Sequence, residues 1–165
     1  MPFRLILLLL SAFILFIPVS TVFYRMGYHE TGITVRFNEI DAYRVAWHGH
    51  YVAWMEIGRT ALAGQFGLDP DQLSAAGFLG PVVDLRVKYL QPARFNDLLT
   101  IRTCLQPSTT ATLVFESEIL GPDGKKLATG LTTHALTDLD GVLQFQLPPV
   151  VAERVERMRA WLEGR

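Results

Sequence analysis

The chain has 165 residues, with 15 lysines and arginines against 16 aspartates and glutamates, so its formal charge is −1. This balance excludes a nucleic-acid-binding protein that relies on phosphate neutralisation, because such proteins are strongly basic. Half of the residues are hydrophobic, which excludes a disordered chain. The single cysteine excludes an intramolecular disulfide and a zinc site of the Cys-x-x-Cys kind.

The first 25 residues differ in composition from the rest of the chain. Residues 5–23 carry no charge, and 15 of these 19 positions are hydrophobic. A stretch of about 20 apolar residues can cross the hydrocarbon core of a bilayer, which predicts a membrane anchor. A cleaved signal peptide and a true translation start at Met26 are the alternatives. In each case we expect the folded domain to comprise residues 26–165.

The next segments predict a strand followed by a long helix. Residues 32–37 alternate between apolar and polar side chains, with Phe37 on the apolar side, which predicts a half-buried strand. Residues 48–66 place apolar side chains at helical spacing, which predicts a central, mostly buried helix. Gly58 lies in this apolar stripe, so we expect the helix to approach a sheet closely there. Gly67 and the Asp-Pro pair that follows it are expected to end the helix.

From Gly80 onward the apolar residues recur at every second position, which predicts strands. Two Asp-Gly turns separate alternating runs, as in antiparallel hairpins. A short charged helix is expected near the C-terminus. One long apolar helix with a run of antiparallel strands predicts an α+β domain in which the sheet wraps around the helix. The expected strands are 83–89, 98–105, 111–120 and 126–137, and the expected helix is 150–162.

Several catalytic or metal centres are disfavoured by the spacing of their residues. His48 and His50 lie two positions apart at a helix start, which is poor geometry for a pair of metal ligands. Cys104 has no histidine or aspartate near it in sequence, so a thiol nucleophile is not expected. The sequence lacks a Gly-x-Ser-x-Gly elbow, which excludes a serine hydrolase of that type. We therefore expect no metal and no cofactor.

Two segments resemble a known family. Residues 35–60 contain an aspartate before the helix, then a polar and aromatic run, then an acidic residue and an arginine on the helix. Residues 81–98 contain a strand followed by a Tyr-x-x-Pro-Ala-Arg corner. Together they resemble the hotdog-fold acyl-CoA thioesterases of the 4-hydroxybenzoyl-CoA thioesterase type, including those associated with the Tol-Pal envelope system. The resemblance covers roughly residues 31–155, and the matching positions of the first segment are Asp41, Val45, His48, Tyr51, Glu56 and Arg59.

This resemblance implies a hotdog fold and hydrolysis of an acyl-CoA to a free acid and CoA. Asp41 is then the general base or the nucleophile, although an aspartate in this position also commonly caps a turn. Backbone N–H groups near His48 would polarise the thioester carbonyl, and the His48 side chain would orient substrate or water unless it is only a surface or capping residue. Glu56 would support the site, or else pair with Arg59.

Three further residues are predicted to bind substrate, namely Arg44, Tyr51 and Arg59. The family usually has glycine where this chain has Arg44, because glycine accepts a positive φ. We therefore expect a different turn or a wider loop there, and the guanidinium is suited to the phosphates of coenzyme A. Tyr51 is also a good candidate for a purely structural aromatic residue of the core.

Two other functions remain open. The first is a non-hydrolytic hotdog module that binds acyl thioesters and is tethered at the membrane. The second, less favoured, is a hotdog dehydratase. Open sheet edges and the resemblance predict a homodimer or homotetramer. Because acyl-CoA is cytosolic, we expect the catalytic domain to face the cytosol, with or without attachment to the inner face of the membrane through residues 5–23.

Overall fold

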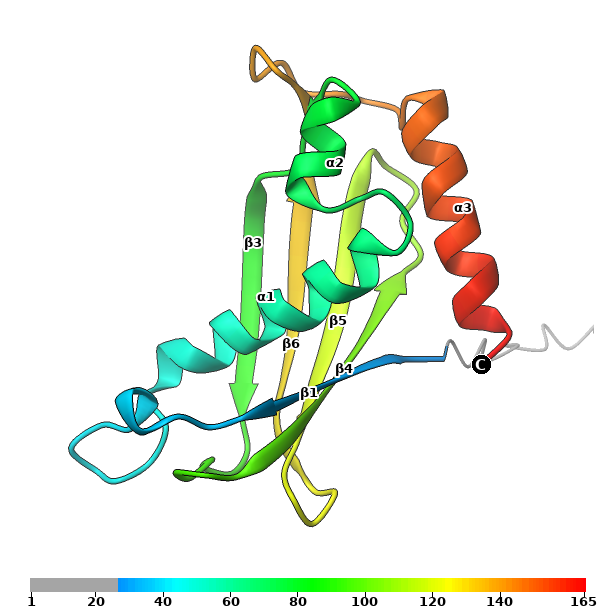
Figure 1. The fold of residues 1–165 in the computed structure, drawn as a ribbon. Helices are drawn as coiled ribbons and strands as arrows, with labels where there is room; N and C mark the ends of the chain where they lie inside the picture. Colours follow the sequence, from blue (N-terminus) through cyan, green and yellow to red (C-terminus); the bar gives the residue numbers. More distant parts are fainter. Residues whose placement is uncertain (1–26) are drawn as a thin grey trace, which may run out of the picture.

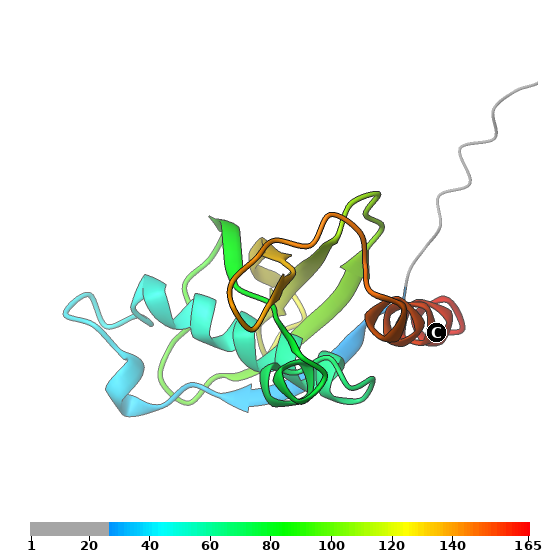
Figure 2. The same ribbon diagram turned by 90° about the horizontal axis from the view of Figure 1, so that it is seen from above.

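The computed structural model describes residues 27–165. Within this range a five-stranded antiparallel sheet curls around one long helix, α1 (His48–Gly64) (Figures 1 and 2). This confirms the predicted hotdog arrangement. Across the sheet the strands are β1 (His29–Thr34), β4 (Leu98–Gln106), β5 (Thr112–Leu120), β6 (Lys126–Ala135) and β3 (Val82–Tyr89).

Shorter elements flank α1 and the sheet. The 3-10 turn η1 (Phe37–Glu39) precedes α1 and α2 (Pro70–Ala75) follows it, while β2 (Phe78–Leu79) pairs with β7 (Thr137–Asp138). The C-terminal helix α3 (Pro149–Glu163) packs beside β4 (Figure 1). The predicted hydrophobic segment 1–25 lies outside the described residues. Among residues 27–165, no helix combines the length and apolar character that crossing a membrane requires.

Helix α1 lies directly against the sheet because small residues meet at the contact. A Cβ atom on Gly58 would stand 2.7 Å from both Ile101 Cγ2 and Thr103 Oγ1. Across the interface, a Cβ on Gly130 would stand 2.7 Å from the Met55 sulfur. The close approach predicted from Gly58 is confirmed. The apolar stripe predicted for the helix is buried at Tyr51, Trp54, Met55, Gly58 and Leu62.

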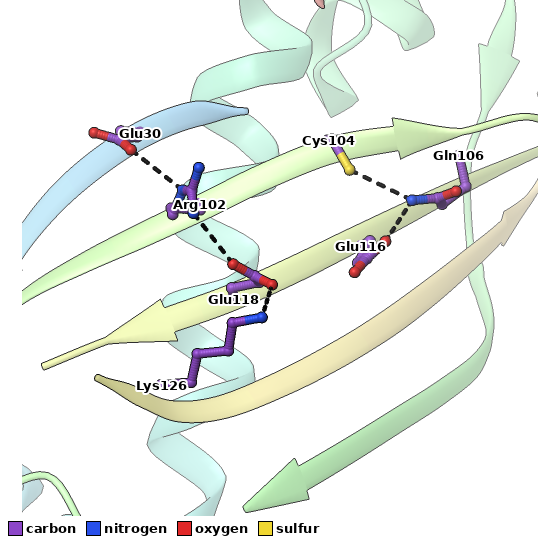
Figure 3. A network of polar contacts seen from close by, with 7 residues as sticks. All are labelled: Glu30, Arg102, Cys104, Gln106, Glu116, Glu118 and Lys126. Carbon is purple, nitrogen blue, oxygen red and sulfur yellow. Dashed lines mark hydrogen bonds and ion pairs between the residues drawn. The ribbon is translucent and has the colours of Figure 1, made fainter. Parts of the chain in front are cut away.

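The face of the sheet that turns away from α1 carries a chain of ion pairs (Figure 3). Arg102 on β4 lies 3.2 Å from Glu30 on β1 and 3.4 Å from Glu118 on β5. Lys126 on β6 lies 2.5 Å from Glu118. The Glu118 side chain is only 7% exposed, and its charge is balanced by one cation on each side. This part of the face is therefore polar, and most of the apolar core lies on the α1 side.

Helix α3 buries the far end of β4. Its apolar stripe belongs to the same buried cluster as Cys104 of β4, which is 1% exposed. Burial, with the neighbouring Glu116 carboxylate, raises the pKa of the Cys104 thiol to about 12. The thiol is therefore protonated at neutral pH and cannot act as a thiolate nucleophile. The α3 residues of this contact are Val151, Val155, Met158 and Leu162.

The first strand ends earlier than the alternation predicts. β1 stops at Thr34, and Phe37 is 80% exposed rather than on a buried face. The cause is local hydrogen bonding, because Glu39 accepts the backbone N–H of Arg36 at 2.7 Å and the chain turns into η1 there. Side-chain capping thus overrides the period-two pattern.

The Asp-Pro pair after α1 begins a helix, which the sequence analysis missed. Asp69 is the N-cap of α2 and accepts the backbone N–H of Gln72 at 2.8 Å. The Gln72 side chain in turn accepts the Asp69 N–H, which forms a capping box with Pro70 in the first turn. The other predicted strands and the C-terminal helix are confirmed, with the end of the last predicted strand forming β7.

Candidate active site

Asp41 lies in a tight turn between η1 and α1. Its backbone N–H donates to the Val45 carbonyl at 2.9 Å, and its own carbonyl accepts the N–H of Arg44 at 3.0 Å. Its carboxylate oxygen Oδ1 accepts the N–H of Tyr43 at 2.8 Å. Asp41 therefore does cap a turn, as the simpler interpretation held. The second oxygen, Oδ2, has no hydrogen bond to any residue of the described range, so it keeps lone pairs with which it can accept a proton or attack a carbonyl.

The start of α1 follows this turn closely. The N-cap residue Trp47 provides no side-chain cap, and the backbone N–H groups of His48 and Gly49 have no partner within residues 27–165. Free N–H groups at a helix N-terminus carry a partial positive charge. The position is therefore suited to stabilising an oxygen that gains negative charge. The His48 side chain is exposed.

An open cleft of about 400 Å³ brings the two groups together. Asp41, His48 and Tyr51 line it, and the opposite wall is the segment from Tyr89 to Pro92. The Tyr89 hydroxyl donates to the His48 carbonyl at 3.0 Å, which fixes this wall to the start of the helix. Three of the residues predicted from the sequence thus share one cavity.

Tyr51 forms the buried side of the cleft. Its side chain is buried, and its hydroxyl oxygen accepts the backbone N–H of Ala93 at 2.7 Å. Burial raises the pKa of Tyr51, so its hydroxyl stays protonated. Tyr51 is part of the core as well as of the cleft lining, and it holds the Tyr-x-x-Pro-Ala-Arg corner in place. This corner carries part of the family resemblance, but no residue of it was predicted for the site from the sequence.

Glu39 is an anchor that the sequence analysis missed. It is buried, and it accepts hydrogen bonds from the Trp54 indole N–H at 3.2 Å and from the Arg36 guanidinium at 2.9 Å. Burial alone would raise the pKa of Glu39, but the hydrogen bonds from Arg36 and Trp54 outweigh burial and lower it. Glu39 thereby ties the Asp41 turn to α1. A carboxylate two residues before Asp41 was the available signal.

Arg44 keeps the backbone conformation that glycine usually provides. Its φ is +62°, so it lies in the left-handed region that L side chains seldom adopt. The expectation of a different turn or a wider loop is therefore wrong. The hydrogen bond from the Arg44 N–H to Asp41 holds the strained residue in place, and the Arg44 side chain is exposed at the edge of the turn.

Glu56 and Arg59 lie further along α1 and do not line the Asp41 cleft. The Arg59 Nε donates to Glu56 at 2.9 Å, and a second Arg59 nitrogen pairs with the other carboxylate oxygen. The hydrogen bond from Arg59 is the main cause that lowers the pKa of Glu56. The Arg59 side chain is 8% exposed and that of Glu56 is 49% exposed. Within one protomer the pair is thus separate from the other predicted site residues.

The comparisons with known proteins agree with this geometry. A family model described as the thioesterase-like superfamily matches residues 35–155. The chain belongs to the thioesterase-like superfamily. The thioesterase is 28% identical to YneP of Bacillus subtilis (strain 168) over 114 residues, which are 69% of this chain and 83% of YneP. It is 29% identical to the long-chain acyl-CoA thioesterase FadM of Escherichia coli (strain K12) over 131 residues, which are 78% of this chain and 98% of FadM.

A solved structure supports the same assignment. The DHNA-CoA thioesterase from Staphylococcus aureus aligns with a TM-score of 0.74 at 25% identity, covering 85% of this chain and 97% of that one. The predicted assignment to the hotdog thioesterases is confirmed, and the enzyme is a thioester hydrolase. The cleft of this thioesterase combines a carboxylate with N–H groups that have no partner in the described part of the chain, and thioester hydrolysis needs both kinds of group.

Proposed function

We propose that the thioesterase hydrolyses acyl-CoA esters to a free acid and CoA at the Asp41 cleft. The observation that carries this proposal is that the Asp41 carboxylate lies at the same cleft as the N–H groups of His48 and Gly49, which have no partner within residues 27–165. FadM is named as an acyl-CoA thioesterase, and the chain aligns with nearly all of it. The thioester carbonyl oxygen would lie against the N–H groups, with the carbonyl carbon toward Asp41.

Two routes are open for the Asp41 carboxylate. As a general base, it removes a proton from water while the water oxygen bonds to the carbonyl carbon, and the C–S bond then breaks to release CoA. As a nucleophile, it bonds to the carbonyl carbon itself, expels CoA and forms an anhydride that water then hydrolyses. In both routes the N–H groups stabilise the carbonyl oxygen while it is negative, and the proton from water ends on the thiolate or the medium.

A single turnover in ¹⁸O-labelled water separates the two routes. With enzyme in excess over an acyl-CoA, the nucleophile route transfers label to Asp41 when water opens the anhydride at the aspartyl carbon. Water attack at the acyl carbon of the substrate places the label only in the free acid. Mass spectrometry of the peptide that contains Asp41 and of the free acid, after this single turnover, locates the label, and label in Asp41 establishes the nucleophile route.

The activity itself is tested with the purified chain, a panel of acyl-CoA esters and a thiol reagent. Release of CoA above the spontaneous rate, lost in Asp41→Asn, supports the proposal. Binding of acyl-CoA without release would instead favour the non-hydrolytic binding module. Binding is measured separately by calorimetry, and the rates across the panel also report the preferred acyl length.

We also infer that two copies pair through β3. This strand is at an edge of the sheet, and apolar side chains on it are exposed, with Val83 at 59% and Leu85 at 40%. An uncovered apolar edge favours pairing with another strand. Antiparallel pairing of two β3 strands about a two-fold axis sets the Tyr89 end of one against the Val82 end of the other.

This pairing has a consequence for Glu56 and Arg59. Gly80 precedes β3, and it lies in the same cavity lining as Arg59. The two-fold axis therefore brings the partner's Gly80 toward the Tyr89 wall of the Asp41 cleft. Each cleft would then have a second wall, formed by the partner's helix and by the start of the partner's β3. In this arrangement Glu56 supports the site from the partner subunit.

We propose that the catalytic domain faces the cytosol, because its CoA ester substrates are cytosolic. Attachment to the inner face of the membrane through residues 5–23 would also keep the domain in the cytosol. A C-terminal fusion to alkaline phosphatase, which is active only after export, should be inactive. A strongly active fusion would place the domain outside the cytosol and contradict acyl-CoA as the substrate.

A further inference from the structure

A small, partly enclosed cavity lies between α1, α2 and the sheet, separate from the Asp41 cleft. Its volume is about 60 Å³, which is room for a few water-sized groups. Most of its wall is apolar, but two nitrogen-bearing side chains reach it, Arg59 from α1 and His134 from β6. They are 7% and 4% exposed. The remaining lining residues are Leu68, Pro70, Leu73, Leu79, Gly80, Leu113 and Phe115.

The orientation of the His134 ring is fixed by one hydrogen bond. Its Nδ1 lies 2.8 Å from the Gly80 carbonyl oxygen. Because a carbonyl only accepts, the proton must be on Nδ1, and Nε2 of the neutral ring is then an acceptor. Nε2 is buried and has no hydrogen-bond partner within residues 27–165. Buried polar atoms are almost always paired, so this acceptor needs an explanation.

Arg59 supplies hydrogen-bond donors to the same cavity. Its Nε and one terminal nitrogen bind Glu56, as described above, and a guanidinium has five N–H donors in all. The aromatic ring of Phe115 adjoins both polar groups, with Arg59 Cζ 5.9 Å and the His134 ring 5.7 Å from its centre. The cavity therefore presents a donor and an acceptor in an otherwise apolar wall.

We infer that this cavity binds the hydroxyl group of an aliphatic acyl chain, so that the thioesterase selects hydroxyacyl thioesters. A hydroxyl both donates and accepts, which matches His134 Nε2 and Arg59 together. A carboxylate fits the cavity poorly, because it would face the lone pair of Nε2 and because Glu56 already balances the charge of Arg59. An aromatic ring would need more room than the cavity has. The inference rests on the proposed acyl-CoA hydrolysis and adds the chemical class of the acyl group.

The position of the cavity suits a chain that starts at the catalytic turn. Within one protomer, Arg59 follows His48 by eleven residues, or about 16 Å along the helix axis. Across the proposed β3 pairing, the partner's Gly80 adjoins the Tyr89 wall, so the partner's cavity is the one that an acyl chain reaches. The experiment therefore varies the distance between the hydroxyl and the thioester, by using esters hydroxylated at successive carbons.

Two matched substitutions separate the acceptor from the rest of the ring. His134→Asn places an amide N–H near the position of Nδ1, which keeps the hydrogen bond to Gly80, but it has no group at the position of Nε2. His134→Gln places an oxygen acceptor near the position of Nε2. Thr133→Val changes the neighbouring residue, whose side chain points to the opposite face of β6, and serves as the control.

The full-length chain and the three variants are assayed with CoA esters of equal chain length, unsubstituted or hydroxylated at successive carbons. A site built for a hydroxyl can reject the analogue that lacks it by roughly 10⁴-fold. Because water can fill this cavity instead, we expect a smaller preference, about tenfold in kcat/KM at the best hydroxyl position. We expect His134→Asn to abolish this preference, and His134→Gln and Thr133→Val to retain it.

The preference for hydroxylated over unsubstituted esters is also measured as a ratio of binding constants. Calorimetry with the same esters and the Asp41→Asn enzyme gives these constants. This keeps the test independent of hydrolysis. If unsubstituted esters are hydrolysed but no hydroxyl position is preferred, or if His134→Asn leaves the preference unchanged, the inference is wrong while the proposed function stands. If no ester is hydrolysed, the proposed function is wrong, and the binding ratio alone decides the inference.

Discussion

The two ends of α1 place their charged groups in opposite surroundings. At its start, the Asp41 turn and His48 border an open cleft, and the backbone N–H groups there lack partners within residues 27–165. Toward its end, the Arg59 guanidinium is buried against Glu56 beside a small, partly enclosed cavity. A group in the open cleft can change its charge at little cost to folding, whereas a buried charge depends on its partner. Substitutions at the first end should therefore change rates, and those at the second end should change rates and stability together.

The largest effect is expected at Asp41. The substitution Asp41→Asn keeps the shape of the side chain and an oxygen that can accept the Tyr43 N–H, but it removes the basic and nucleophilic carboxylate. We expect kcat to fall by about 10²-fold or more, the lower range for a general base, with the melting temperature nearly unchanged. CoA release followed with a thiol reagent gives the rate, and calorimetry gives the stability.

Asp140→Asn is the matched control, because Asp140 is an exposed aspartate in a turn of the β7–α3 loop. This substitution should leave kcat and the melting temperature at the wild-type level. Turnover of Asp41→Asn close to wild type would remove Asp41 from the mechanism.

The next largest effect tests whether the two ends meet across a dimer. Leu85→Lys introduces a charge on the exposed edge of β3, where a paired strand would have to bury it. We expect the chain to sediment as a monomer at micromolar concentration and to lose at least about tenfold in kcat/KM, because the partner's wall of the cleft is lost. Lys88→Arg, on the same strand, keeps its charge and should change neither the oligomeric state nor kcat/KM. A Leu85→Lys enzyme that is monomeric and fully active would mean that each protomer has a complete site.

Glu56→Gln is expected to act on rate and stability at once. It leaves Arg59 buried with only a neutral partner, so we expect kcat to fall by about tenfold and the unfolding temperature to fall as well. A larger loss of rate than in Asp41→Asn would mean that the roles of the two carboxylates are reversed. Arg59→Lys keeps a cation and should retain most of the stability only if charge alone matters.

The pH dependence of stability gives a separate measure of the same pair. The pKa of Glu56 is lowered from 4.5, chiefly by the hydrogen bond from Arg59. Its contribution to the free energy of unfolding is therefore present above about pH 4.5 and is lost as the pH falls through the lowered value. The stability difference between wild type and Glu56→Gln should shrink as the pH falls from neutral through this range. A difference that is constant with pH would show that Glu56 is not stabilised by Arg59.

The sequence predicted the first end of α1 better than the second. Asp41, His48 and Tyr51 are close in the chain, so a local motif brings them together. Helix α1 and the strands after Gly80 also followed from local periodicity. His134 was not predicted, because it shares a cavity with Arg59 only through the pairing of segments that are distant in the chain, such as Leu113 of β5 with His134 of β6. Such long-range contacts leave no local pattern in a single sequence. The early end of β1 was missed because the Glu39 side chain, rather than periodicity, decides it.

The smallest expected effect concerns the strained residue at the first end. A left-handed conformation costs an L residue other than glycine about 1–2 kcal/mol, and the greater chain entropy of unfolded glycine offsets part of this. We therefore expect Arg44→Gly, where φ is +62°, to raise the free energy of unfolding by about 0.5–1 kcal/mol. Asn96 has a φ of +67°, and because asparagine tolerates this region better, Asn96→Gly should stabilise less.

The same position also tests whether strain and substrate binding are separate at the Asp41 turn. If the Arg44 guanidinium contacts the CoA phosphates, its loss should raise KM by roughly three- to tenfold, as expected for one solvent-exposed charged contact of about 1 kcal/mol. Arg44→Ala removes the guanidinium but keeps the strain, so it should raise KM equally without the gain in stability. A rise in KM with glycine but not with alanine would mean that the strained turn, not the charge, positions the substrate. Equal KM values in all three enzymes would exclude Arg44 from substrate binding and leave the strain as its only effect on the open end of the helix.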